Sequence, residues 1–320
     1  MSFLFGPVPS RRLGRSLGID VIPPKTCSLD CIYCESGATT HLSLKRQYFA
    51  EPAEVLREVE EFFGRFPRGA DALTFSSAGE PTLYSGIGEL IRLLKTKYPD
   101  IPLVVLTNGS LLWDSDVRKD LLQADRVVPS LDAVSPGAFN AINRPHPALR
   151  IDAILEGLHA FRQEYGGRLH IEVMLVSGVN DNPDELSALA DAIALIEPDA
   201  IELNTVVRPP ALPGTRGLTE VEMKRAASFF PAGLTTIIGC FRASELETDR
   251  EDLPNRILTT IERRPCTIPE LAASLGISEH LLKAESLRLR SQGRLVMALF
   301  EGKAFLCPPQ RKQGEPSGSL

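Results

Sequence analysis

The sequence predicts an α/β protein in which parallel strands form a full or partial barrel, followed by a small second domain. Six short apolar runs, rich in β-branched residues, alternate with segments of helical spacing. Each run is apolar enough to be buried on both faces, as the strands of a parallel sheet are. The charge also changes along the chain: residues 1–253 hold 25 Lys and Arg against 35 Asp and Glu, whereas residues 254–320 hold 10 against 6. We therefore place a domain boundary near Pro254.

The predicted strands and helices alternate along residues 1–253. The strands are residues 17–22, 72–75, 103–106, 126–131, 169–176 and 200–207. Apolar residues recur at i, i+4, i+7 and i+8 from Val55, and at i, i+3, i+4 and i+7 from Ile87 and from Leu186, which indicates amphipathic helices. This alternation predicts a curled parallel sheet whose chemistry lies at the carboxyl ends of its strands.

Three of the six cysteines lie in one short stretch, TCSLDCIYCESG, just beyond the first predicted strand. Cys27, Cys31 and Cys34 give the spacing C-x3-C-x2-C. The composition is that of a globular protein, with no signal peptide and no membrane span, so we expect a cytoplasmic location. In that reducing setting clustered cysteines are more typical of metal ligands than of disulfides.

Three kinds of site are open for these cysteines. A zinc site would take His41 as its fourth ligand, although C-x3-C-x2-C-x6-H fits the usual finger spacings poorly. A thiol cluster without metal is the second, although free buried cysteines behave as scattered small hydrophobic residues. The third is an iron-sulfur cluster, in which three thiolates leave one iron open for a ligand.

With Tyr33 before the last cysteine, the spacing resembles the radical S-adenosylmethionine (SAM) superfamily. The resemblance implies a partial (β/α)6 TIM-type barrel with a 4Fe-4S cluster held by the three cysteines. The open iron of that cluster would chelate the amino and carboxylate groups of SAM. Tyr33 belongs to the SAM-binding set that this resemblance implies.

Further motifs of the family follow at the predicted strand ends, in the family's order. The residues that match them are Ser77, Ala78, Gly79 and Glu80 in a GGEP-like turn, Asn108 in TNG, Ser130 and Asp132 after the fourth strand, and Val176 in the fifth. The resemblance implies that the turn receives the SAM ammonium, that Ser130 and Asp132 contact the ribose, and that Val176 packs on the adenine. Met174 and Asp181 depart from the family's glycine and glutamate.

The resemblance also implies a reaction. A reduced cluster would cleave SAM to methionine and a 5′-deoxyadenosyl radical, which abstracts hydrogen from a substrate; a ferredoxin or flavodoxin is the expected reductant. The segments 5–14, 17–20 and 143–145 look most like wyosine-synthase-like iron-sulfur oxidoreductases. Wyosine synthases carry a second cysteine set upstream, and none precedes Cys27, which argues against wyosine chemistry itself. The catalytic residues and the substrate stay unknown.

Several basic residues lie near the predicted strand ends. Lys25 and Lys45 are interpreted as solvated surface lysines. For five arginines, substrate phosphate or carboxylate binding and surface ion pairs are both open; these are Arg11, Arg12, Arg15, Arg144 and Arg208. Of the remaining cysteines, Cys266 and Cys307 are expected to be structural, and Cys240 is left open.

Residues 254–307 predict three helices and a hairpin, which resemble a winged-helix domain. The helices are residues 255–263, a second opened by a capping box at Thr267–Glu270 and ended by Gly276, and residues 278–292; the hairpin is 294–299 with 303–306. Lys283 and Arg290 share one face of the third helix, where such domains present side chains to DNA. Residues 308–320 are expected to be disordered.

Two functions are consistent with these features. In the first, a radical SAM enzyme uses the winged helix to recruit RNA or protein as its substrate. In the second, a DNA-binding regulator senses the cluster and SAM without turnover. The SAM-binding motifs favour the enzyme.

Overall fold

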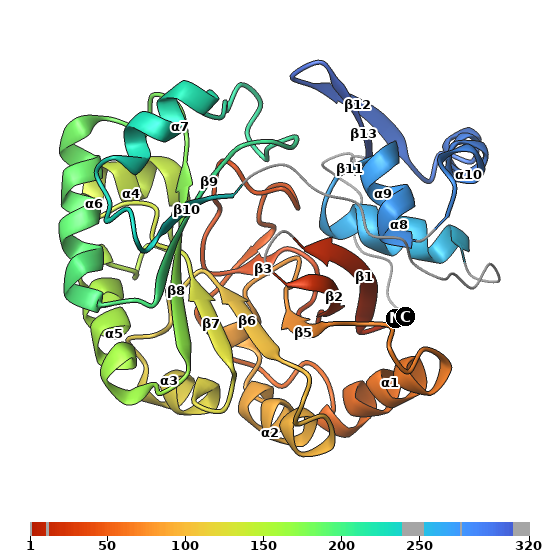
Figure 1. The fold of residues 1–320 in the computed structure, drawn as a ribbon, viewed down its shortest axis with the longest axis horizontal. Coiled ribbons are helices and arrows are strands. Elements are labelled where there is room, and N and C mark those ends of the chain that lie inside the picture. Colours follow the sequence, from red (N-terminus) through yellow and green to blue (C-terminus); the bar gives the residue numbers. More distant parts are fainter. Residues whose placement is uncertain (1, 11–12, 239–252, 276, 310–320) are drawn as a thin grey trace.

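A single curved sheet organises most of the molecule (Figure 1). The computed structural model describes residues 2–10, 13–238, 253–275 and 277–309. The strand order is β1-β2-β5-β6-β7-β8-β9-β10. The bounds are β1 Leu4–Ser10, β2 Gly14–Ile19, β5 Ala72–Phe75, β6 Leu103–Thr107, β7 Arg126–Pro129, β8 Arg168–Leu175, β9 Ala200–Thr205 and β10 Thr235–Ile237. A separate two-stranded sheet pairs β3 (Thr26–Cys27) with β4 (His41–Leu42).

The six predicted strands are β2 and β5 to β9, and they pair in parallel throughout. The predicted α/β architecture with a partial barrel is thereby confirmed. Two strands of the large sheet were not predicted, and neither were the short strands β3 and β4. β1 pairs antiparallel to β2 at one edge of the sheet and contains Pro7, a residue that strands tolerate mainly at an edge. β10 has three residues at the other edge, too few to give a periodic signal.

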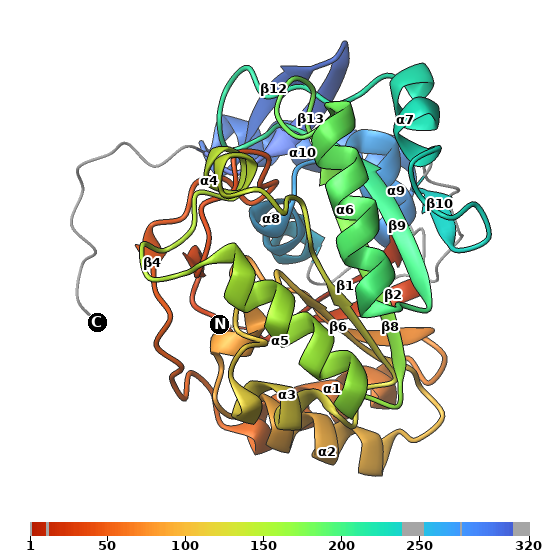
Figure 2. The same cartoon turned by 90° about the vertical axis from the view of Figure 1, so that its left-hand side faces the viewer.

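Helices cover the outer face of the sheet. They are α1 Pro52–Arg65, α2 Ile87–Lys97, α3 Ser115–Leu121, α4 Pro136–Asn143, α5 Ile151–Glu164, α6 Pro183–Ile196 and α7 Glu220–Ala227, with the short 3-10 helix η1 at Pro81–Leu83. Figure 2 shows α6 beside β9, with α5 packed against α6. The spacing of apolar residues explains how the helices pack on the sheet. On α1, for example, Val55, Val59 and Phe63 are four residues apart on one face, and all three are buried.

The last part of the chain has its own hydrophobic core. Its helices are α8 Leu253–Arg263, α9 Ile268–Leu275 and α10 Glu279–Ser291, and its strands are β11 Cys266–Thr267, β12 Val296–Phe300 and β13 Lys303–Cys307. The strands pair antiparallel in the order β11-β13-β12. In the predicted capping box, the amide of Thr267 donates to the carboxylate of Glu270, and the amide of Glu270 donates to the hydroxyl of Thr267. Gly276 lies outside the described residues, as does residue 252 before α8. The domain limits and the winged-helix assignment stay predictions.

This C-terminal part lies against β1 through α8 and α9 (Figure 1). The guanidinium of Arg263 stacks over the ring of Phe5 at 4.5 Å, a cation–π arrangement. Its Nε donates to Asp20 at 2.8 Å, and both side chains are largely buried. The hydroxyl of Ser274 donates to the carbonyl of Pro7 at 3.3 Å. The contacts therefore join the C-terminal core to the first two strands.

In the part of the chain that the structure describes, no helix has the length and apolar character needed to cross a membrane.

Candidate active site

The loop after β2 carries all three clustered cysteines and is closed by backbone hydrogen bonds. Cys27 lies in β3, and the amide of Cys34 donates to the carbonyl of Cys31 at 3.1 Å. The amide of His41 donates to the carbonyl of Lys25 at 3.0 Å, which brings the end of the loop back to its start. The three thiols form no disulfide and are partly buried. The loop thus presents three sulfurs without disulfide bonds at the carboxyl end of the first parallel strand.

Two side-chain amides reach these sulfurs from other elements. Asn108, which follows β6, donates through Nδ2 to the Sγ of Cys27 at 3.4 Å. Asn143, the last residue of α4, donates to the Sγ of Cys31 at 3.4 Å. Hydrogen bonds to sulfur stabilise ligating thiolates and tune a cluster's reduction potential. Asn108 was predicted to belong to the site, whereas Asn143 was noted only as part of a resemblance and its contact was missed.

The surroundings of the thiols favour their protonated form. Burial raises the pKa of Cys27 to about 12, and the charge of Glu80 adds to this effect. Burial also raises the pKa of Cys31 and of Cys34, although the charge of Lys25 acts in the opposite direction at Cys34. Thiolates are the metal-binding form, so metal binding at this loop must release protons.

The turn after β5 packs on the backbone of the cysteine loop. The amide of Lys25 donates to the carbonyl of Ala78 at 3.0 Å. A Cβ on Gly79 would lie 2.0 Å from the carbonyl oxygen of Thr26, so a glycine is required for this approach. The hydroxyl of Ser77 is buried and has no hydrogen-bond partner among the described residues. The turn therefore offers an unsatisfied polar atom beside the cysteines.

Glu80 is buried and uses both carboxylate oxygens within the chain. It accepts from the hydroxyls of Thr82 and Thr107, each at 2.6 Å, and from the amide of Asn108 at 2.7 Å. Burial raises its pKa, and these hydrogen bonds act against that shift. Glu80 thus fastens the turn to the end of β6. A contact between Glu80 and the SAM ammonium stays a prediction.

A buried network joins the cysteine loop to the strands on the other side of the site. The hydroxyl of Tyr33 donates to Oδ2 of Asp132 at 2.5 Å, and Nδ2 of Asn143 donates to the same oxygen at 2.7 Å. The amide of Met174 donates to Oδ1 of Asp132 at 2.9 Å. Burial raises the pKa of Asp132 to about 6, against the effect of these hydrogen bonds. The predicted site residues Tyr33 and Asp132 are therefore in direct contact.

Asn180 fixes the loop after β8 and could not be identified from the sequence. Its Nδ2 donates to the carbonyls of Asp132 and Met174, each at 2.8 Å, and its Oδ1 accepts from the amide of Val176 at 2.8 Å. Val176 is almost fully buried and Ser130 is partly exposed. Their predicted contacts with adenine and ribose stay predictions.

Two contacts connect the cysteine loop to the C-terminal part. The buried guanidinium of Arg208 pairs with Glu35 at 2.9 Å and with Glu270 at 3.2 Å. The hydroxyl of Ser36 donates to the carbonyl of Arg263 at 2.6 Å. Glu35 directly follows the last clustered cysteine. Of the two roles left open for Arg208, the structure therefore shows ion pairing.

The two lysines near the site differ in exposure. Lys45 is exposed, as expected. The expectation of a solvated surface position was wrong for Lys25, because its ammonium is buried and has no hydrogen-bond partner among the described residues. Burial lowers the pKa of Lys25, whereas nearby Cys34, Cys27 and Asp30 act to raise it. The backbone bonds of Lys25 fold it inward, which a sequence pattern does not reveal.

The remaining candidates lie elsewhere. Arg15 pairs with Asp71 at 2.7 Å on the surface, and Arg144 ends α4 in a left-handed conformation. Cys266 and Cys307 are buried in the C-terminal part. Arg11, Arg12, Cys240 and most of the tail lie outside the described residues.

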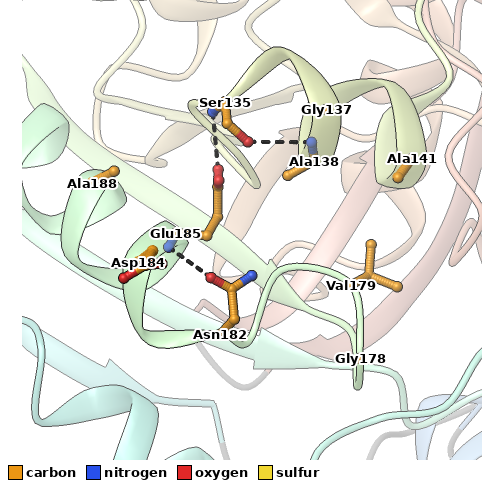
Figure 3. Close-up of a pocket in the computed structure, with 10 residues that line it drawn as sticks. All are labelled: Ser135, Gly137, Ala138, Ala141, Gly178, Val179, Asn182, Asp184, Glu185 and Ala188. Carbon is orange, nitrogen blue, oxygen red and sulfur yellow. Dashed lines mark hydrogen bonds between the residues drawn. The ribbon is translucent and has the colours of Figure 1, made fainter.

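Two hollows flank this part of the molecule. A cavity of about 10 Å³ is lined by Asn108, Ser130, Asp132 and Asn143, beside the sulfurs. A larger groove of about 570 Å³ lies between the starts of α4 and α6, where Glu185 accepts from the amide of Ser135 (Figure 3). The predicted cofactor residues do not line this groove.

Among the described residues, no three His, Cys, Asp or Glu side chains are grouped as ligands of one metal ion. In a cluster, by contrast, each thiolate binds its own iron.

The model of the Radical SAM superfamily matches residues 21–190, which include every predicted cysteine ligand and SAM-binding residue. The chain belongs to the radical SAM superfamily. Its members bind a 4Fe-4S cluster and SAM, and these are the cofactors of this protein. Membership also makes it an enzyme of SAM-dependent radical chemistry, without specifying its reaction.

Similarity to known proteins extends beyond residues 21–190. A UPF0026 protein of Methanocaldococcus jannaschii is 35% identical over 95% of this chain and 95% of its own. The tRNA 4-demethylwyosine synthase of Danio rerio is a distant relative, 26% identical over 59% of this chain and 27% of its own. A radical SAM methyltransferase from Sphaerobacter thermophilus shares the fold, with a TM-score of 0.52 at 17% identity, over 69% of this chain and 66% of that one.

Proposed function

We propose that Cys27, Cys31 and Cys34 hold the 4Fe-4S cluster, and that SAM bound beside it is cleaved reductively to start hydrogen abstraction from a substrate. The observation that carries this proposal is the convergence of separate elements on the cysteine loop. The side-chain amides of Asn108, after β6, and of Asn143, in α4, reach two of the sulfurs, and the turn after β5 packs on the loop backbone.

The residues around the loop suit a cluster. Asn108 and Asn143 supply N–H donors to sulfur, as cluster sites do. The buried ammonium of Lys25 has no partner among the described residues, and an anionic group in the loop would provide one. The three thiols are free to ligate.

The turn after β5 suits SAM. The glycine at position 79 keeps its backbone close to the cysteines, and the unpartnered hydroxyl of Ser77 can accept a hydrogen bond from an ammonium. Glu80 then acts by holding the turn in place, because both of its oxygens are already bonded. Asp132 lies opposite, with Tyr33 and Asn143 fixing its carboxylate.

When bound and reduced, the cluster supplies the electron that splits SAM into methionine and a 5′-deoxyadenosyl radical. The chain positions the reactants and excludes water from them. Leu29 and Ile32, between the cysteines, are buried, which keeps the loop interior apolar. A dry site protects a radical from side reactions.

We further propose that a ferredoxin or flavodoxin is the reductant and that the C-terminal part recruits an RNA or protein substrate. Arg208 and Ser36 support this arrangement, because they tie the cysteine loop to α8 and α9. The reaction would take place in the cytosol, where thiols stay reduced.

Anaerobic assembly with iron and sulfide tests the proposed ligands. The wild-type protein and Cys307→Ala, which removes a thiol outside the loop, should both bind the cluster and form 5′-deoxyadenosine from SAM under dithionite. Cys34→Ala should form none. Deoxyadenosine formation by Cys34→Ala at the wild-type rate would overturn the assignment.

A further inference from the structure

Lys25 has an unusual place in the cysteine loop. It lies two residues before Cys27, and its backbone φ is 64°, in the left-handed region. Its amide donates to Ala78 in the turn after β5, and its carbonyl accepts from the amides of Thr40 and His41 at the end of the loop. These three hydrogen bonds fix the residue at the junction of the loop and the turn. The direction of its side chain is therefore set by the backbone.

The side chain of Lys25 extends across the loop to the residues behind Cys34. A Cβ built on Gly37 would lie 3.4 Å from Nζ, in ordinary contact. Gly37 is itself anchored, because its amide donates to the carbonyl of Cys34 at 3.0 Å. The ammonium thus lies within the loop, where the charges of Cys34 and Cys27 act on it.

Two other buried cations near the loop are paired with carboxylates. Arg208 pairs with Glu35 and Glu270, and Arg263 pairs with Asp20. The Lys25 ammonium, in contrast, is buried without a hydrogen-bond partner in the described chain. The charges of Asp30 and of the loop cysteines act on it without a hydrogen bond. A buried charge that lacks a hydrogen-bonded partner is costly, so this group indicates an anionic partner that completes the site.

We propose that the ammonium of Lys25 is a fixed positive charge that raises the reduction potential of the cluster held by Cys27, Cys31 and Cys34. This inference rests on the proposed function, because it takes those cysteines as the ligands. Lys25 is a positioning residue: it acts through the cluster and is given no contact with the substrate.

The direction of the effect follows from electrostatics. Reduction adds one negative charge to a cluster that already carries thiolates, and a nearby cation stabilises the reduced form more than the oxidised form. Burial reduces solvent screening, so the interaction is stronger than one at the surface. Lys25 therefore eases electron transfer from a donor of limited reducing power.

The test is a redox titration of the assembled holoprotein, followed by electron paramagnetic resonance at a fixed pH. Lys25→Met should lower the ratio of reduced to oxidised cluster at a given ambient potential by about tenfold, equivalent to about 59 mV for one electron. Lys25→Arg retains the charge and should stay close to the wild type. Lys45→Met, which removes an exposed lysine, should change the ratio by less than about twofold.

Each outcome decides between the alternatives. An unchanged ratio in Lys25→Met, or an equal shift in Lys45→Met, would overturn the proposal. Lys25→Gln provides a second neutral variant, and absorbance reports cluster content in each sample. If both neutral variants fold without binding a cluster while Lys25→Arg binds one, the charge acts on assembly and the tuning role is wrong. Failure of the wild type to bind any cluster would instead count against the proposed function.

Discussion

Tyr33 and Asp132 meet in a partly buried hydrogen bond of 2.5 Å, although 99 positions separate them in the sequence. Tyr33 lies directly before the last clustered cysteine, and Asp132 follows β7. The bond therefore joins the cysteine loop to the far wall of the site. Because Asn143 donates to the same oxygen and also to Cys31, the geometry of the loop and of the wall depend on one carboxylate.

Tyr33→Phe removes one donor from Asp132 and leaves the ring in place. We expect the free energy of unfolding to fall by about 1.5–3 kcal/mol, the usual contribution of a hydrogen bond to a charged group, because Oδ2 of Asp132 keeps only its bond from Asn143. SAM binding should weaken as well, because the loop loses its tie to the wall. Denaturant unfolding and calorimetric titration with SAM measure the two effects. Tyr48→Phe is the control, since Tyr48 is exposed. An equal loss in both variants would contradict a special role for the Tyr33–Asp132 bond.

Asp132 gives the ligand-free protein a specific pH dependence. Its pKa is raised by burial from 3.8 to about 6, so between these values the folded protein binds a proton more readily than the unfolded chain. The free energy of unfolding should therefore fall as pH rises from about 4 to about 6, by an amount on the order of 3 kcal/mol. Unfolding at several pH values, compared with Asp132→Asn, isolates this contribution. A difference between the two proteins that stays constant with pH would contradict it.

Arg208→Met should loosen the cysteine loop from the C-terminal part. The substitution leaves Glu35 and Glu270 without their shared partner. We expect the free energy of unfolding to fall by about 2–4 kcal/mol. This is near the lower end for broken buried ion pairs, because both carboxylates are partly exposed. Thermal unfolding and the rate of iron loss to a chelator measure the effect. Arg15→Met, the control, breaks a surface pair with Asp71 and should change the thermal unfolding and the rate of iron loss by little. Iron loss at the wild-type rate in Arg208→Met would show that the link does not support the loop.

Gly79→Ala should displace the turn after β5. The added Cβ would lie 2.0 Å from the Thr26 carbonyl, so the turn must move away from the cysteines. A misplacement of about 1 Å at a reacting site lowers the rate by about a hundredfold. We therefore expect Gly79→Ala to form deoxyadenosine about a hundredfold more slowly than the wild type. Gly64→Ala, in α1, meets nothing within 4 Å and is the matched control. Full activity of Gly79→Ala would exclude a role for the turn in binding SAM.

The parallel strands and the cysteine loop could be predicted because their signals are local. A continuous apolar run such as residues 72–75 is buried on both faces and identifies a central strand without further information. The edge strand β1 lacks that signal, because it contains proline and packs partly against the C-terminal part. Its position depends on residues far away in the sequence.

The candidate ligands follow from the cysteine spacing, whereas the contacts that support the cysteine loop could not be predicted. Asn143, Asn180 and Arg208 act through hydrogen bonds to partners distant in the chain, and no periodicity marks them. Lys25 was misjudged for the same reason. Its burial results from backbone contacts with the turn after β5, which are visible only in the folded chain.

The most direct test of the central claim combines two observations on one anaerobic sample of reconstituted protein. After reduction with dithionite, electron paramagnetic resonance is recorded before and after SAM is added, and 5′-deoxyadenosine is quantified. We expect a reduced-cluster signal that SAM perturbs, together with deoxyadenosine. A cluster whose signal is indifferent to SAM and that yields no deoxyadenosine would contradict the proposed radical chemistry.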